Sequence, residues 1–172
     1  MNEILKAIRD RRSCRSYRPE QLTEADLQQI LEAGTWAASG MGAQSARMVV
    51  VQDPETRAAL QRMNAAIMGV DSDPFYGAPT VVVVLADPER ATCVEDGSLV
   101  IGNLMLAASS LGVGSCWIHR ARQEFDAPEG KALLKKWGVP ERYIGVGHCI
   151  LGYPAAAPAA PKPRKADYVR RV

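Results

Sequence analysis

The stretch RRSCRSYR, residues 11–18, places four arginines among eight residues near the start of the chain. Apolar residues recur at a helical spacing just before it, so residues 2–11 are expected to form a short amphipathic helix. Cations at a helix C-terminus interact favourably with the helix dipole, which would account for Arg11 and Arg12. The helix end leaves the other two arginines of the stretch unexplained.

A phosphate site is the interpretation that uses most of the stretch. Such a site needs several guanidinium donors that converge on one dianion beside a hydroxyl group, and R-R-S-x-R supplies them within five residues. A nucleic-acid arm would need more cations and stacking aromatic rings, of which only Tyr17 is near. Cys14 between arginines is also compatible with a redox thiol, although no second cysteine is near in sequence. The phosphate site and the helix end are the leading interpretations, and they are compatible with each other.

The distribution of charge adds a second observation. The 172 residues suit a single domain, and 47% hydrophobic with 23% charged residues is typical of a folded protein. The net charge of +2 is too small to indicate a nucleic-acid or membrane partner. Residues 1–18 nevertheless carry six Lys/Arg against two Asp/Glu, and residues 162–172 carry five against one. If the two ends meet in the fold, they form one basic patch.

Cysteine usage and hydropathy favour a cytoplasmic protein without a membrane partner. The four cysteines contain no C-x-x-C pair, so they indicate neither a disulfide framework nor a metal site. The N-terminus lacks the apolar core of a signal peptide, and no apolar stretch approaches the ~18 residues that a membrane span requires.

Helices and strands alternate irregularly, which predicts the α+β class with a sheet covered by helices. The apolar run 80–86 does not alternate, as is typical of a strand covered on both faces. The helix over 96–112 is apolar nearly all round, which places it in the interior or in an oligomer interface. In the second helix Thr23 is the expected N-cap and Gly34 the expected C-cap. Helices are expected over residues 2–11, 22–34, 54–68, 96–112 and 128–137, and strands over 47–52, 80–86, 115–119 and 143–153.

Several common catalytic motifs are absent from the sequence. There is no P-loop, and GVGSCW at 112–117 lacks the third glycine of a dinucleotide loop and precedes a strand. His119 and His148 fall in expected strands, where a core or edge histidine is the simpler interpretation. No Ser-His-Asp or paired-carboxylate arrangement is visible.

Seven features nevertheless follow one another in a fixed order. They are R-R-S-x-R after the first helix, a small-residue loop with Ser39, Gly40 and Gln44, GAP at 77–79, GN at 102–103, LGVGSCWI at 111–118, LGYP at 151–154 and KPRK at 162–165. This order and spacing resemble the nitroreductase family of FMN-dependent oxidoreductases, in its short form, from about residue 4 to the end.

The resemblance implies a fold, an assembly and a set of FMN contacts. The fold would be a nitroreductase-like α/β/α sandwich with a mixed, mainly antiparallel sheet, in one domain over residues 1–172. Residues 155–172 would form an extended C-terminal arm, and an intertwined homodimer would hold two FMN molecules at its interface. The FMN phosphate would be bound by Arg11, Arg12, Ser13 and Arg15, joined by Arg164 with Lys162 or Lys165. The loop residues Ala38, Ser39, Gly40 and Gln44 would reach the flavin from the other subunit, while Trp117, Ile118 and His119 would lie along its ring, with a backbone N–H near N5.

The sequence departs from the family pattern at the pocket. The family loop reads P-S-x-x-N-x-Q-P-W. This chain has Ala38 in place of Pro, Gly42 in place of Asn, and Ser45-Ala46 in place of Pro-Trp. Arg120 follows His119 where the family usually has glycine. The phosphate motif is intact, so FMN binding is better supported than any particular substrate.

The resemblance implies an oxidoreductase with a ping-pong mechanism. NADH or NADPH would give a hydride to FMN N5, and a small electron-poor acceptor, a nitroaromatic or a quinone, would then take the electrons. The flavin carries the chemistry, so no catalytic side chain is expected, with His119 the candidate for donating a proton to substrate. The alternative is a non-catalytic flavin- or anion-binding module with a degenerate substrate pocket.

Overall fold

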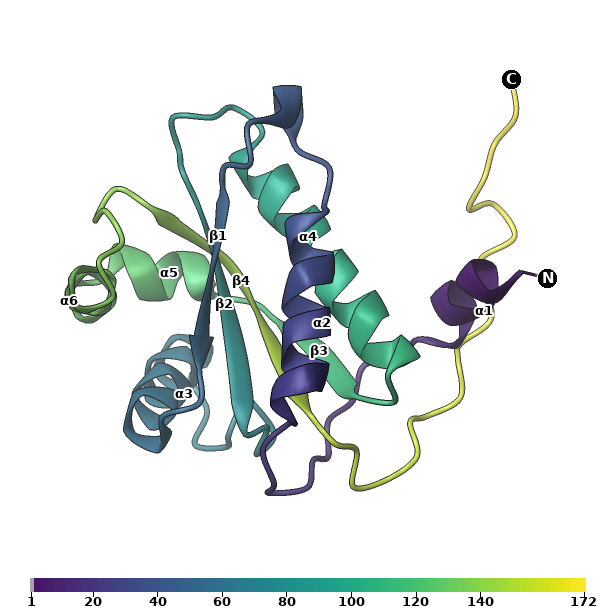
Figure 1. The fold of residues 1–172 in the computed structure, drawn as a ribbon, viewed down its shortest axis with the longest axis horizontal. Coiled ribbons are helices and arrows are strands. Elements are labelled where there is room, and N and C mark those ends of the chain that lie inside the picture. Colours follow the sequence, from purple (N-terminus) through teal and green to yellow (C-terminus); the bar gives the residue numbers. More distant parts are fainter. Residues whose placement is uncertain (1) are drawn as a thin grey trace.

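Four strands form an open sheet, and the computed structural model, which describes residues 2–172, covers both faces of that sheet with helices (Figure 1). The strands are β1 Ala46–Val51, β2 Thr80–Ala86, β3 Gly114–Ile118 and β4 Ile144–Gly152, in the spatial order β1-β2-β4-β3. Each neighbouring pair is antiparallel. Parallel pairing enters through an isolated bridge between Ser13 and Ser115. The α+β sandwich with a mainly antiparallel sheet is therefore confirmed.

Two helices pack on one face of the sheet and three on the other (Figure 1). The first layer is α2 Glu24–Thr35 and α4 Cys93–Ser110, and the second is α3 Pro54–Met68, α5 Ala121–Asp126 and α6 Pro128–Lys136. A short helix α1, Glu3–Asp10, lies at the side of the sandwich and contacts α4, and a 3₁₀ turn, Gly40–Gly42, precedes β1.

Strand β2 explains why the sheet needs both layers. Its side chains alternate between the two cores: Val82 and Val84 pack with α2 and α4, and Val83 packs with the opposite layer. All three are completely buried. Burial of a valine contributes about 1.5–3 kcal/mol, so a strand that is apolar at every position stabilises both layers at once. The expectation of a strand covered on both faces is confirmed.

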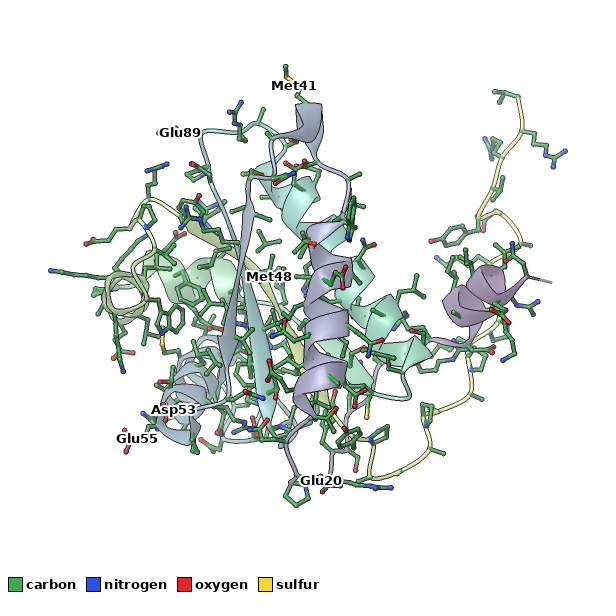
Figure 2. The ribbon with its side chains drawn as sticks, viewed as in Figure 1. Glu20, Met41, Met48, Asp53, Glu55 and Glu89 are labelled. Atoms are coloured by element: carbon green, nitrogen blue, oxygen red, sulfur yellow. The ribbon has the colours of Figure 1, made fainter. Side chains whose placement is uncertain are left out.

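Helix α2 begins as the sequence predicts but ends differently. The Thr23 side chain accepts a hydrogen bond from Asp26 N–H at 3.1 Å, the expected N-cap. The prediction that Gly34 ends the helix is wrong, because α2 continues to Thr35 and Gly34 is buried. A Cβ at Gly34 would lie 2.8 Å from the sulfur of Met48 on β1, which packs beside α2 (Figure 2). Gly34 therefore allows close packing of the helix on the sheet.

Two further differences concern the second helical layer. Helix α5 was not expected, because six residues are too few to show a helical period. The helical spacing of residues 54–68 predicts that Ala66 and Ile67 share one face with Leu60 and Met63; in α3 both are instead exposed, while Asn64 is completely buried. The buried face of α3 is rotated because Asn64 makes hydrogen bonds inside the protein.

The two ends of the chain lie together beside the sandwich (Figure 1). Residues 155–172 are exposed and contain neither helix nor strand. A hollow of about 560 Å³ lies between the end of α1 and the segment 161–164, and its lining includes Arg12, Lys162 and Arg164. The basic patch expected if the ends meet is therefore present. Within residues 2–172, no helix has the length and apolar character to cross a membrane.

Candidate functional site

The arginine stretch leaves α1 and runs along the outer edge of β3. Ser13 pairs with Ser115, and Cys14 N–H donates to the Ser115 carbonyl at 2.8 Å. Arg11, two residues before Ser13, is partly buried, and its buried Nη1 has no hydrogen-bond partner within residues 2–172. A buried donor without an acceptor is destabilising, and a bound anion would supply the acceptor.

Arg12 serves the helix end. Its Nη1 donates to the carbonyls of Arg9 and Arg11 at 2.6 and 2.7 Å, the last turn of α1 and the residue after it. Arg12 also lines the hollow shared with Lys162 and Arg164, whereas Lys165 is exposed outside that lining. Both interpretations of the stretch thus have a structural counterpart, and Arg12 takes part in both.

A second hollow, the β3 cavity, lies where β3 ends. Its volume is about 230 Å³, and it brings Arg15 together with the predicted ring-binding residues. Its lining includes Arg15, Tyr76, Trp117, Ile118, His119 and Arg120. The Arg15 guanidinium carbon lies 5.9 Å from the centroid of the Tyr76 ring, a cation–π distance.

Positive charge dominates the β3 cavity. Asp73 lines it too, but its Oδ2 pairs with Arg57 Nη2 at 2.8 Å. Burial alone would raise the pKa of Asp73, yet hydrogen bonds from Arg57 and from backbone N–H groups outweigh burial and lower that pKa. No carboxylate among the described residues lies within 4.0 Å of Arg15 or Arg120. The cavity therefore suits an electron-rich or anionic ligand.

Cys116 links the arginine stretch to the cavity. Burial raises the pKa of its thiol, while the Ser13 hydroxyl and the charge of Arg15 oppose the rise without cancelling it. The neutral thiol is a poor nucleophile. Cys116 therefore contributes surface to the cavity rather than reactivity.

The loop residues Ala38, Ser39 and Gln44 line a different, smaller hollow of about 150 Å³ between α2 and β1. Asp96 of α4, which sequence reasoning missed, holds this loop: its Oδ1 accepts from Gly40 N–H at 2.9 Å. Its Oδ2 accepts from the buried Ser45 hydroxyl at 2.8 Å.

The backbone of the loop takes unusual conformations beyond the Asp96 anchor. Ser39 Oγ accepts from Gln44 N–H at 3.0 Å, and Gln44 has φ 49°. Met41, with φ 55°, is fully exposed and projects from the tip of the loop (Figure 2). Most residues with a side chain disfavour left-handed φ values, so we infer that the hydrogen bonds hold the loop backbone in this conformation.

The predicted loop and ring residues do not meet within one chain. The loop precedes β1, at one edge of the sheet, and the β3 cavity lies at the opposite edge. Neighbouring strands are about 4.8 Å apart, so three spacings separate the two edges by roughly 14 Å. Within one chain, Ala38, Ser39, Gly40 and Gln44 therefore lie away from the β3 cavity.

Three buried polar residues behind the cavity were also not predicted as part of a site. His148 is completely buried, and its Nε2 lies 2.9 Å from Glu124 Oε2, which confirms a core histidine. Asn64 joins them through Glu124. His119, in contrast, is exposed at the end of β3. No local pattern marks Asn64, Glu124 and His148, because their contacts join three separate elements.

Comparison with known proteins shows which family shares this sequence and fold. The nitroreductase family model matches residues 8–70 and 66–153. A solved nitroreductase with bound FMN from Bacteroides fragilis has a TM-score of 0.91 and 35% identity, covering 100% of both chains. A relative from Archaeoglobus fulgidus, provisionally named NADH dehydrogenase/NAD(P)H nitroreductase, is 35% identical over 90% of this chain and 87% of its own. An FMN reductase (NAD(P)H) from Bacillus subtilis is 26% identical over 95% of this chain and 70% of its own. The sequence motifs, the sandwich and these matches agree: the chain belongs to the nitroreductase family.

Proposed function

We propose that this protein is an FMN-dependent NAD(P)H oxidoreductase that reduces small electron-poor acceptors such as nitroaromatics or quinones. The observation that carries the proposal is the unpartnered, buried Nη1 of Arg11, a residue whose charge acts on Cys116 in the wall of the cationic β3 cavity. FMN, when bound, would supply the chemistry by accepting a hydride from NADH or NADPH and passing it on in a ping-pong sequence. The names of the similar proteins, which include FMN-bound structures, support the same assignment.

The residues present fit FMN in charge and in hydrogen bonding. Arg11 offers a donor that lacks an acceptor, and Ser13 adds a hydroxyl beside the outer edge of β3. Arg12, Lys162 and Arg164 add cations around the hollow at the end of α1. Guanidinium groups and a hydroxyl together suit a phosphate dianion. Trp117 and His119 would flank the ring, with Arg15 supplying positive charge to stabilise electron density on it.

We also propose a homodimer, because the surface carries an apolar area that a second copy would cover. Ile4 and Ile8 of α1 are exposed, and Trp36 is 79% exposed. A hollow of about 450 Å³ between α1, α2 and α4 is lined mainly by apolar residues, including Leu106. Exposed apolar areas of this kind mark interaction sites. In such a dimer the loop of residues 38–44 would reach the partner's β3 cavity, and the exposed residues 155–172 would extend along the partner.

Cofactor binding and turnover test the proposal directly. Purified protein should be yellow, bind added FMN, sediment as a dimer, and oxidise NADH or NADPH with a quinone faster than free FMN does. Arg11→Ala should raise the FMN Kd about 10- to 100-fold, because a hydrogen bond to a charged group is lost. Arg18→Ala, which removes an exposed arginine of the same stretch, should not. A colourless protein that takes up no FMN would refute the proposal.

A non-catalytic flavin- or anion-binding module is the alternative. It is favoured by the altered loop residues Ala38 and Gly42 and by Arg120 at the usual glycine position. Such a module would hold FMN with the same Arg11 dependence but would not accelerate NAD(P)H oxidation above free FMN. Steady-state turnover of the FMN-loaded protein separates the two functions.

A further inference from the structure

A chain of buried polar contacts runs from β4 to the wall of the β3 cavity. His148 of β4 and Glu124 of α5 are both completely buried, and His148 Nε2 lies 2.9 Å from Glu124 Oε2. The other Glu124 oxygen accepts a hydrogen bond from the Asn64 side chain. Phe75 and Phe125 surround the imidazole, with ring centroids 5.3 and 6.3 Å away. Polar groups in such an apolar shell hold one geometry, because any other arrangement leaves them unpaired.

The free Nδ1 of His148 identifies the direction of these hydrogen bonds. This atom is buried and has no partner within residues 2–172. A proton on Nδ1 would be a buried donor without an acceptor, so the proton belongs on Nε2 and is donated to Glu124. Glu124 then accepts two hydrogen bonds, one from each neighbour. Asn64 is thereby fixed with its NH₂ group toward Glu124.

The same Asn64 amide holds the turn that follows β3. Asn64 Nδ2 donates to the His119 carbonyl at 2.8 Å, and Arg120 Nε donates to Asn64 Oδ1 at 3.0 Å. Only one orientation of the amide satisfies Glu124, His119 and Arg120 together. The network therefore holds the turn at two points, the backbone carbonyl of His119 and the side chain of Arg120.

The backbone conformation of Arg120 shows why hydrogen bonds are needed to hold this turn. Arg120 has φ 80°, in the left-handed region that glycine favours. A non-glycine residue is held there only when its surroundings impose the conformation. The peptide between His119 and Arg120 is trans and planar, so its carbonyl and its N–H point in opposite directions. Because the carbonyl points at the buried Asn64, the N–H of Arg120 points away from the interior, and Arg120 borders the cavity.

We propose that Asn64, oriented by Glu124 and His148, is a positioning residue for the flavin ring in the β3 cavity. It keeps the His119 carbonyl inward and the Arg120 N–H outward, available to a ring acceptor. This inference rests on the proposed function, because it takes FMN as the ligand of the cavity. The three residues touch no ligand themselves and act through the turn.

Binding and spectroscopy of the FMN-loaded protein test this role. Asn64→Leu keeps the side-chain size but removes all of its hydrogen bonds. It should raise the FMN Kd about tenfold and change the visible circular dichroism of bound FMN, because the turn loses its anchor. Thr80→Val is the matched control, since it removes a buried hydroxyl that bonds Gln21 at 2.7 Å, outside the cavity lining. The control should lower the melting temperature without altering either flavin readout.

Two further variants should have smaller effects on the FMN Kd than Asn64→Leu. Glu124→Gln keeps an acceptor for Asn64 but removes the charge, and should raise the Kd about threefold. Arg120→Gly removes the guanidinium that bonds Asn64 Oδ1, but glycine accepts the left-handed φ without strain, so this variant should raise the FMN Kd less than Asn64→Leu does.

The outcomes separate this inference from the proposed function. Wild-type protein that binds no FMN would overturn both. Wild-type protein that binds FMN while Asn64→Leu, or Glu124→Gln if the first variant does not fold, shows an unchanged Kd and spectrum would overturn the positioning role alone. Loss of affinity in Thr80→Val equal to that in Asn64→Leu would also overturn it, because the effect would then follow stability and not position.

Discussion

Replacing Asp96 with Asn should destabilise the protein by about 2 kcal/mol at neutral pH and loosen the loop of residues 38–44. Asp96 is only 4% exposed, and its carboxylate accepts from Gly40 N–H, from the Ser45 hydroxyl and, at 3.3 Å, from Thr92 Oγ1. Asparagine has the same shape but no charge and only one acceptor oxygen, so the charge-assisted hydrogen bonds are lost and the Ser45 and Thr92 hydroxyls must accept from its NH₂ group instead of donating. Hydrogen bonds to a charged group contribute about 1.5–3 kcal/mol net, and loss of one sets the expected magnitude.

Thermal unfolding at fixed protein concentration measures this effect. For a chain of this size, 2 kcal/mol corresponds to a fall in Tm of about 4–8 °C. The concentration must be held constant because a dimer's apparent stability depends on it. Asp71→Asn removes a carboxylate from an exposed position and should leave Tm within about 1 °C of wild type. If Asp96 positions the loop for the partner's cavity, Asp96→Asn should also weaken FMN binding.

The pH dependence of the unfolding free energy gives a second, independent test of the role of Asp96. Burial alone would raise the pKa of Asp96, but the hydrogen bonds from Gly40, Ser45 and Thr92 outweigh burial and lower that pKa below its usual 3.8. A carboxyl group whose folded pKa is depressed contributes stability above its unfolded pKa and loses it as the pH falls through the folded pKa. The difference in unfolding free energy between wild type and Asp96→Asn should be constant from about pH 7 to 5 and shrink below about pH 4. Equal stability at neutral pH, or a difference that does not shrink at all between pH 5 and about pH 2.5, would refute the reasoning.

Three other substitutions test separate parts of the structure. Trp36→Ser, at the exposed apolar area, should raise the dimer dissociation constant at least about tenfold in sedimentation equilibrium without lowering helix content, and an unchanged constant would place the interface elsewhere. Gly145→Ala should cost about 3 kcal/mol or more in urea unfolding, because the new Cβ would lie 2.1 Å from the Ala121 carbonyl oxygen; a stable variant would show that α5 can move off β4. Tyr17→Phe leaves the Cys14 carbonyl without its 2.8 Å hydrogen bond and should cost about 1 kcal/mol, detectable by the same titration, whereas no change would mean that solvent replaces the phenol.

The features that the sequence predicts correctly are those with local causes. The N-cap of α2 depends on Thr23 and a residue three positions later, and the bounds of α3 follow from Pro54 and from Gly69, which has φ 73°. Strand β2 is visible as an unbroken apolar run because both of its faces are covered. In each case the residues that fix the element are neighbours in the chain, so a short window of sequence contains the physical cause.

Gly34 and Asp96 show where that reasoning stops. A glycine near the end of a helical pattern favours a C-cap, but Gly34 is required by Met48 and Leu104, which come from two other elements. Asp96 looks like an ordinary acidic residue in the first turn of a helix, yet it is buried because it holds the loop before β1. The cause in both cases is a contact between elements that are far apart in the chain. A single sequence does not show which distant residues make such a contact.

Arg120 and Asn64 show how such hidden contacts bear on function. In sequence, Arg120 is only a departure from the family's glycine, and Asn64 interrupts the apolar face of α3. In the structure each explains the other, because left-handed φ costs a side-chain-bearing residue about 1–2 kcal/mol and the hydrogen bond from Arg120 to Asn64 offsets part of this cost. Asn64 can accept that bond only while Glu124 and the His119 carbonyl occupy its two N–H groups. A substitution at any of these positions should therefore be judged by its effect on the turn beside the cavity, and the energies of Asn64 and Arg120 variants should be non-additive in a double-mutant cycle.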